Sequence, residues 1–246
     1  MSESDAHAIE ITLRIPGQWE HPAELYDQIP DGYRLAPEGF LLPDGTILEA
    51  SPMPADDQFP EVFAGSCRLP PSDAESQAVD GYTVNFCLSG SGGTLQRVRT
   101  MMRAAEAILD AGGAGVFIDN CGLSHGARHW RDLTEDGSPG ALRFAFVSIV
   151  RNLQQVWTVG MHVFGCPEIT MKRADAEKDE QLIVETILYF MTSEKEIGDG
   201  HTLADENGPR FKLTALPCDG FAVGGPMHNP WGRLKLVSCQ DIAESN

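Results

Sequence analysis

Residues 81–120 decide the fold, and they read GYTVNFCLSGSGGTLQRVRTMMRAAEAILDAGGAGVFIDN. Apolar and polar residues alternate over 82–88, which is typical of a half-buried strand. Five small residues, Ser-Gly-Ser-Gly-Gly, then interrupt the pattern and predict a turn. From Leu95 onward the apolar residues follow helical spacing, and Thr94 is a suitable N-cap. The stretch therefore predicts a strand, a glycine loop and an amphipathic helix in direct succession.

The helix ends at Gly112-Gly113, and the short apolar run 114–118 predicts a second strand. A strand, helix and strand joined this closely favour a parallel pair with a right-handed crossover. We therefore expect the loop at 89–94 and the polar segment at 121–130 to emerge at the same edge of the sheet, where ligands bind in open α/β sheets.

The rest of the chain alternates between apolar runs and turn residues, which predict further strands and helices. Strands are expected at 9–15, 61–69, 142–150, 156–163, 168–172, 211–216 and 234–239, and a hairpin at 41–48. Helices are expected at 21–29 and from Asp175 onward. Loops or linkers are expected at 50–60, 70–80 and 193–208.

This order of elements predicts an α+β protein with a mixed β-sheet packed by two main helices. The first half is compatible with a ferredoxin-like, split βαβ arrangement. Asp136-Gly137-Ser138-Pro139-Gly140 is the best candidate for an internal boundary. We expect two α+β halves, 1–135 and 141–246, packed on each other as one compact unit.

The charge of the chain is strongly negative and unevenly distributed. The formal net charge is -18, and the first sixty residues contain twelve acidic residues against only Arg14 and Arg34. Such a charge argues against nucleic acid or an anionic membrane as the main partner. A solvated acidic surface and a face for a basic protein partner are the two interpretations.

Cysteine and lysine positions exclude several kinds of site. The six cysteines never form a Cys-x-x-Cys pair, and no lysine precedes Lys172. A zinc ribbon, a thioredoxin-like motif and a lysine-dependent P-loop in the first two thirds are therefore excluded. The N-terminal residues lack an apolar stretch and no run is long enough to span a bilayer, so we expect a cytoplasmic protein with reduced thiols.

Two motifs resemble a known bacterial family. Ala114-Gly115-Val116-Phe117-Ile118 followed by Ser124-His125 and Trp130 is the first, and Gly160-Met161-His162-Val163-Phe164-Gly165-Cys166-Pro167-Glu168 is the second. Together they are similar to a domain family of unknown function over roughly residues 80–240. The resemblance implies a bacterial cytoplasmic α+β domain and supplies no catalytic residues.

The glycine loop is the first candidate site, because backbone N–H groups before a helix attract anions. Its residues are Gly90, Gly92, Gly93 and Thr94, with Arg97 in the first helical turn. The pattern departs from G-x-G-x-x-G at Leu95, and a simple tight turn is the competing interpretation.

Cys121, His125 and His129 form the second candidate, because four-residue spacing places them on one face of a helix. A metal could be held there, with its shell completed by one of four further residues. These are His162, Cys166, His201 and His228. Gly122 and Gly126 disfavour that helix, so we expect polar loop residues and predict no metal or cofactor.

The second motif offers a Cys-His pair, His162 and Cys166, which needs an aligned acid to act as a catalytic unit. A strand exit and turn is the competing interpretation, since Pro167 holds Cys166 extended.

Without a complete catalytic constellation, we expect a non-catalytic binding protein whose acidic N-terminal face meets a protein partner. The alternative is a phosphate- or small-anion-binding domain, or an enzyme, that combines the glycine loop with Ser124, His125 and His129.

Overall fold

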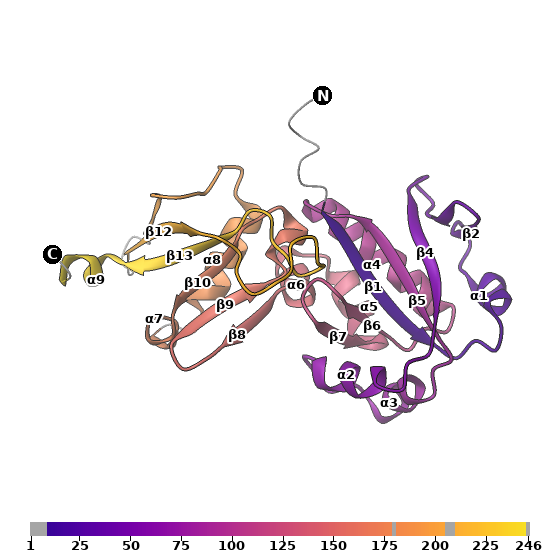
Figure 1. Ribbon diagram of the computed structural model, residues 1–246. Helices are drawn as coiled ribbons and strands as arrows, with labels where there is room; N and C mark the ends of the chain where they lie inside the picture. The colour runs from indigo at the N-terminus through magenta and orange to yellow at the C-terminus, as the bar shows by residue number, and fades with distance from the viewer. Residues whose placement is uncertain (1–8, 179–180, 205–209, 245–246) are drawn as a thin grey trace.

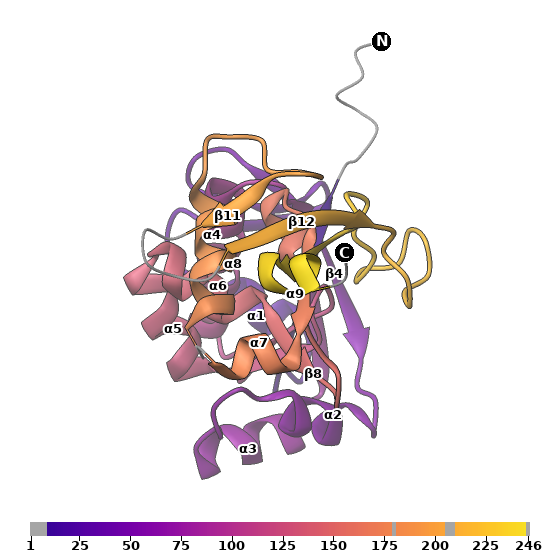
Figure 2. The same ribbon diagram turned by 90° about the vertical axis from the view of Figure 1, so that its left-hand side faces the viewer.

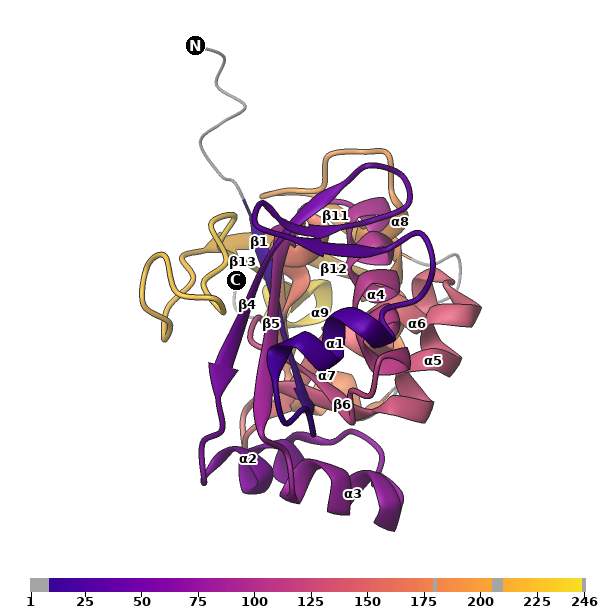
Figure 3. The same ribbon diagram turned by 90° about the vertical axis from the view of Figure 1, so that its right-hand side faces the viewer.

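The computed structural model describes residues 9–178, 181–204 and 210–244. Two β-sheets lie side by side, with helix α6 between them (Figure 1). Helices α4, α5, α6 and α8 gather on the same side of the molecule in both end views (Figures 2 and 3). Within these described ranges, no helix is both long enough and apolar enough to cross a bilayer.

The first sheet has seven strands in the order β2-β3-β4-β5-β1-β6-β7, all antiparallel to their neighbours. The strands are β1 (Glu10–Gly17), β2 (Arg34–Ala36), β3 (Gly39–Leu41), β4 (Ile47–Pro54), β5 (Val84–Ser91), β6 (Gly115–Ile118) and β7 (Leu123–Gly126). Ile11, Leu13 and Ile15 of β1 are fully buried, and β1 contacts α4. The predicted alternation of this strand is therefore confirmed.

The second sheet has the order β11-β12-β13-β10-β9-β8. Its strands are β8 (Ser148–Arg151), β9 (Gln155–Val159), β10 (Glu168–Lys172), β11 (Thr202–Ala204), β12 (Arg210–Leu216) and β13 (Arg233–Ser238). β10 and β13 are parallel and the other pairs are antiparallel, so this sheet is the mixed one. One cluster of buried hydrophobic residues extends from Ile11 in the first sheet to Leu236 in the second.

The helices are α1 (Pro22–Gln28), α2 (Phe59–Ser66), α3 (Asp73–Asp80), α4 (Leu95–Asp110), α5 (Ala127–Asp136), α6 (Pro139–Phe146), α7 (Arg173–Lys178), α8 (Leu182–Thr192) and α9 (Cys239–Glu244), with a 3-10 helix η2 (Met161–Phe164). The α+β class and helix α4 agree with the prediction. The packing is richer than two helices, because α5 and α6 also pack against α4.

The predicted parallel pair is wrong in one respect. β5 and β6 do not hydrogen-bond to each other, because each is an antiparallel neighbour of β1. They run in the same direction with β1 between them, which is the split βαβ arrangement expected for the first half. The strand before α4 also continues beyond the predicted end at Leu88, through Gly90, as far as Ser91.

Two segments in the first half are helical rather than strand and linker. Residues 61–69, predicted as a strand, belong mostly to α2, where Phe59 and Phe63 lie four residues apart and are both buried. The predicted linker 70–80 contains α3, which begins with a capping box formed by Ser72 and Glu75. That signal was present in the sequence as Ser-x-x-Glu. The first residues of the predicted loop 50–60 belong to strand β4, which ends at Pro54. Beyond Leu48 this strand pairs with β5 but no longer with β3.

The second half differs at two places. The predicted strand 142–150 is split into helix α6 and strand β8, because Ser138 caps a helix that has proline in its first turn. The predicted boundary 136–140 is the turn between α5 and α6, which pack against each other. The helix expected from Asp175 is divided into α7 and α8.

Candidate functional site

The glycine loop has little capacity left to bind an anion. The backbone N–H of Gly92 donates to Ile9 O at 2.8 Å, and that of Gly93 donates to Val163 O at 2.8 Å. Arg97 Nη1 donates to Gly92 O, and the Arg97 N–H is capped by Thr94 Oγ1 at 3.2 Å. The anion hypothesis required these donors to face outward. Instead, they hold the loop against the start of β1 and against η2.

The loop needs glycine for close packing rather than for ligand approach. A Cβ at Gly90 would lie 2.6 Å from Leu48 Cδ2 and 2.7 Å from Met101 Sδ. Gly90 therefore lets α4 approach the sheet. The tight-turn interpretation agrees with these contacts.

The histidine segment lies at the other end of the sheet. After β6, strand β7 turns back, so that His125 pairs with Val116 near the beginning of β6. The glycine loop follows Ser91, which pairs with Glu10 at the start of β1. The expected shared edge is therefore wrong for His125 and His129, and the structure does not bring them together with the glycine loop.

The two histidines contact each other within an aromatic cluster. His125 Nε2 donates to Ala145 O at 3.0 Å, which leaves Nδ1 as an acceptor 3.4 Å from His129 Nδ1. Burial lowers the pKa of His125 to about 4, so its imidazole is neutral at neutral pH. Phe144 and Trp130 pack around the pair.

The remaining members of this candidate have structural roles. Ser124 is fully buried and its hydroxyl donates to Phe63 O. Cys121 is also buried, which raises the pKa of its thiol to about 12. Over the described ranges, no three His, Cys, Asp or Glu residues are placed to hold a metal ion.

The predicted Cys-His pair is separated, although one of its members does meet an acid. His162 Nδ1 lies 3.4 Å from Glu168 Oε1, and both side chains are almost completely buried. Cys166 instead directs its thiol towards Phe190 O at 3.4 Å, and burial raises its pKa to about 12. A protonated thiol on the far side of the turn is not a poised nucleophile.

Glu168 is the centre of a buried hydrogen-bond network that sequence reasoning missed. Its Oε1 accepts from Gly160 N at 3.1 Å, Met161 N at 3.0 Å and Asn229 Nδ2 at 3.0 Å. Its Oε2 accepts from Thr158 Oγ1 at 2.7 Å. Because these donors come from β9, the start of η2 and the β12–β13 loop, one carboxylate fixes three segments.

Asn229 transmits this network to the surface. Its Oδ1 accepts the backbone N–H of Trp231 at 2.9 Å, and its Nδ2 also donates to Cys166 O. The side chain of Trp231 remains 38 % exposed. Glu168 therefore holds, through Asn229, the turn that presents an indole ring at the mouth of a cavity.

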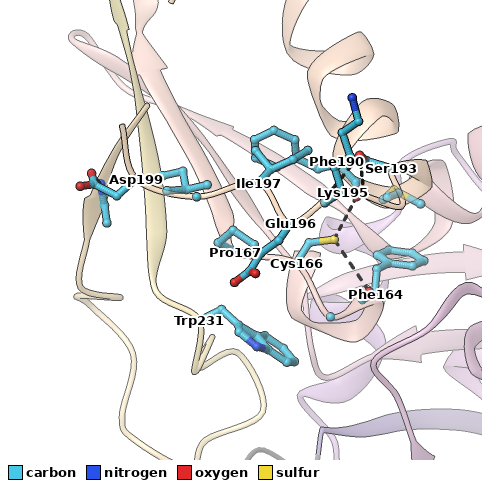
Figure 4. A pocket seen from close by; sticks show the side chains of 15 residues that line it. Phe164, Cys166, Pro167, Phe190, Ser193, Lys195, Glu196, Ile197, Asp199 and Trp231 are labelled. Carbon is cyan, nitrogen blue, oxygen red and sulfur yellow. Dashed lines mark hydrogen bonds between the residues drawn. The ribbon is translucent and has the colours of Figure 1, made fainter. Parts of the chain in front are cut away.

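That cavity has a volume of about 450 Å³ and lies under residues 193–199, which we name the strap. Its apolar wall comes from η2, the turn between η2 and β10, α8 and β13, and contains Phe164, Pro167, Phe190, Met191 and Leu234. Figure 4 shows Glu196 of the strap with its carboxylate turned towards Pro167 and Trp231, while Lys195 points away. Lys195 and Asp199 also line the cavity, and Glu196 is exposed to solvent at its edge. An apolar wall with a carboxylate beside an indole can accept a cationic group.

The strap is anchored at its C-terminal end. Asp199 Oδ1 accepts from Ala215 N at 2.8 Å, and Gly200 N donates to Leu213 O at 3.0 Å. The partly buried Ile197 packs against the hydrophobic core. The first part of the loop predicted over 193–208 thus forms one wall of the cavity, whereas Thr202–Ala204 form strand β11 and residues 205–209 lie outside the described residues.

A second cavity, of about 710 Å³, lies between β1 and the β12–β13 loop. His162 lines it and donates from Nε2 to Pro226 O at 2.9 Å. Arg14 and Asp119 also line it and form a two-pronged ion pair, with N–O distances of 2.8 and 2.9 Å. The hydrogen bond that Arg14 donates to Asp119 is the main cause that raises the pKa of Arg14. Because these groups already pair with each other, this cavity offers less for a ligand than the strap cavity.

We use the name acidic N-terminal face for the acidic side chains of β1, α1, the β2–β4 region and the loop after β4. Its described acidic residues are Glu10, Glu20, Glu24, Asp27, Asp31, Glu38, Asp44, Glu49, Asp56 and Asp57. The ion pairs of the described chain involve none of them. Tyr26, Ile47 and Met53 are exposed apolar side chains in the same region, at 56, 53 and 39 % exposure.

Comparison of the chain with protein-family models, curated proteins and solved structures found no match. The resemblance to a bacterial family of unknown function therefore stays a prediction.

Proposed function

We propose that this protein is a non-catalytic binding protein for a basic partner, and that the strap cavity receives a cationic side chain of that partner. The observation that carries the proposal is the Glu196 carboxylate beside the Trp231 indole at an apolar cavity. A lysine or arginine side chain fits this combination, because its aliphatic stem contacts the apolar wall while its charge meets the carboxylate and the indole.

The overall charge supports the same class of partner. A net charge of -18 attracts a cationic molecule over a distance comparable to the Debye length, which is about 8 Å at physiological salt. Such attraction raises association rates more than it raises affinity. We therefore expect binding to weaken as salt concentration increases.

Three ionisable side chains support a binding rather than a catalytic role. The thiols of Cys121 and Cys166 have pKa values raised to about 12 by burial, and His125 has a pKa lowered to about 4. None of these groups is tuned to exchange protons near neutral pH.

The acidic N-terminal face is the second docking surface for a basic protein. Its support is the combination of carboxylates outside any described ion pair with the exposed Tyr26, Ile47 and Met53. Apolar side chains among acidic ones suit an amphipathic basic segment.

The test is calorimetric titration with a hexalysine peptide, using hexaglutamate as the probe of opposite charge. Glu196→Gln is expected to weaken hexalysine binding by about fivefold, a typical effect of removing one carboxylate from a partly desolvated ion pair. The matched control is Glu194→Gln, since Glu194 is exposed on the same strap but does not line the cavity. We expect that control to change the affinity by less than about twofold.

A second variant separates the two surfaces. Glu49→Gln combined with Asp57→Asn removes two exposed carboxylates of the N-terminal face. If this variant loses hexalysine binding while Glu196→Gln retains it, the N-terminal face is the docking surface and the strap cavity is not. Equal affinity for hexalysine and hexaglutamate would contradict the proposal for both surfaces.

A further inference from the structure

Two arginines of this acidic protein share one aromatic ring. The Cζ atom of Arg68 lies 4.7 Å from the centroid of the Phe144 ring, and that of Arg143 lies 5.7 Å from the same centroid. Arg68 follows α2 in sequence, whereas Arg143 is in the last turn of α6. Tertiary packing therefore brings together two positive charges that are far apart in the chain.

No carboxylate neutralises this pair in the part of the chain that the structure describes. None of the ion pairs found there includes Arg68 or Arg143. The Nε atom of Arg143 is buried and has no hydrogen-bond partner among the described residues. Arg143 as a whole is only partly buried, but a buried N–H donor without an acceptor is costly.

The titration behaviour of the two arginines agrees with this geometry. The pKa of Arg68 is lowered, first by burial and then by the charge of Arg143. The pKa of Arg143 is lowered by burial. Both guanidinium groups remain charged, because the ordinary pKa of arginine lies far above neutral pH.

The end of helix α6 supplies only part of the missing negative charge. Arg68 Nη2 donates to Val147 O, the carbonyl of the C-cap residue. A helix C-terminus carries about half an elementary charge, which cannot balance two guanidinium groups. Helix capping therefore accounts for Arg68 and leaves Arg143 without a function.

An open hollow of about 480 Å³ lies beside Arg68, which lines it together with Gly65, Ser66, Gly122 and Ser148. None of the residues that line this hollow is acidic, and Arg143 is not one of them. His129, whose ring centroid lies 5.4 Å from that of Phe144, adds an imidazole nearby.

We propose that Arg68 and Arg143 form a binding site for an oxyanion, either a phosphate or a carboxylate group. Guanidinium groups bind both through paired N–H donors, and the planar fork of arginine suits this geometry better than the ammonium of lysine. A bound oxyanion would accept from the accessible guanidinium nitrogens of both arginines, and its negative charge would offset the repulsion between them. This site accepts an anion, so it is independent of the proposed cationic ligand of the strap cavity.

The test is calorimetric titration of the full chain with inorganic phosphate and, separately, with acetate, in chloride buffer at constant ionic strength. Wild-type protein is expected to bind at least one of them with a millimolar or lower Kd, and Arg143→Gln is expected to weaken that binding at least about tenfold. Whichever of phosphate and acetate binds shows which class of oxyanion the site accepts. The matched control is Arg131→Gln, which removes the same charge from an exposed pair with Asp110 and leaves the affinity within about twofold.

Thermal unfolding provides the structural control. In chloride alone, Arg143→Gln is expected to have a Tm equal to or above that of the wild type, because it removes a charge without a partner. If it unfolds, Arg143→Lys keeps the charge without the fork and is expected to weaken oxyanion binding by several-fold. The proposed site would be overturned if the wild type bound neither anion, or if the wild type and the Arg143 variants bound the anion equally well.

Discussion

Glu168 and the Arg68–Arg143 pair are ionisable groups that differ in how many hydrogen-bond partners the protein gives them. The carboxylate of Glu168 accepts hydrogen bonds from Thr158, Gly160, Met161 and Asn229. Among the described residues, Val147 O is the carbonyl that accepts from Arg68, and the buried Nε of Arg143 has no hydrogen-bond partner. A fully satisfied buried charge fixes the segments around it, whereas an incompletely satisfied one marks a place where an external group can bind.

The largest expected effect comes from removing the Glu168 charge. Glu168→Gln keeps the shape but places an NH₂ group among donors, so we expect the free energy of unfolding to fall by about 3 kcal/mol. Urea-induced unfolding measures this change. The same substitution at the exposed Glu135 is the control and is expected to change stability by less than about 0.5 kcal/mol. If Glu168→Gln also lowered stability by less than about 0.5 kcal/mol, the network would not be what holds the fold.

The second prediction concerns pH and the buried, neutral His125. Its folded-state pKa of about 4 lies below the ordinary value of 6.5, so the unfolded chain binds more protons between these values. Stability from this group is therefore present above pH 6.5 and is lost as pH falls towards 4. Linkage gives a loss of about 2 kcal/mol between pH 7 and pH 5.

Unfolding experiments at these two pH values measure the effect of His125 by comparison with His125→Gln. The carboxylates that titrate in the same range contribute equally to both proteins, so the difference in pH dependence reports on His125. Parallel pH profiles for wild type and variant would contradict the burial of a neutral imidazole.

The smallest expected effect is the repulsion between Arg68 and Arg143. In a buffer without phosphate or carboxylate, the Arg68→Met, Arg143→Met double variant is expected to lose about 0.5 kcal/mol more stability than the sum of the single variants. The reason is that either single substitution already relieves the repulsion. Additive changes in the free energy of unfolding would indicate that the two charges do not interact.

Local sequence patterns predicted the parts of the fold that local physics controls. The alternation of β1, the N-cap Thr94 and the helix α4 all follow from periodicity and capping within a few residues. The errors at α2 and α6 have a common cause, since short apolar runs do not distinguish a strand from a buried helix. The error at α3 is different, because its polar sequence was interpreted as a linker. The capping signals Ser72-x-x-Glu75 and Ser138-Pro139 could have corrected two of them.

Site prediction from sequence failed where it assumed that local spacing brings residues together. Cys121, His125 and His129 have helical spacing, but β7 separates Cys121 from the helix that begins at Ala127. Glycines 90, 92 and 93 resemble an anion loop, but the N–H groups of Gly92 and Gly93 donate to Ile9 O and Val163 O, and neighbouring side chains fill the space at Gly90 and Gly92. In the second motif, the structure does place His162 beside an acid, Glu168, although Cys166 is not part of this arrangement.

The sequence by itself determined the charge of the protein, the α+β class and the strand–helix–strand unit at 84–118, because composition and short-range periodicity govern them. Tertiary structure alone decided which polar groups meet. Glu168 and Asn229 are 61 residues apart, and Arg68 and Arg143 come from separate elements. Such juxtapositions depend on sheet order and helix packing, so neither the strap cavity nor the paired arginines had a signature in the sequence.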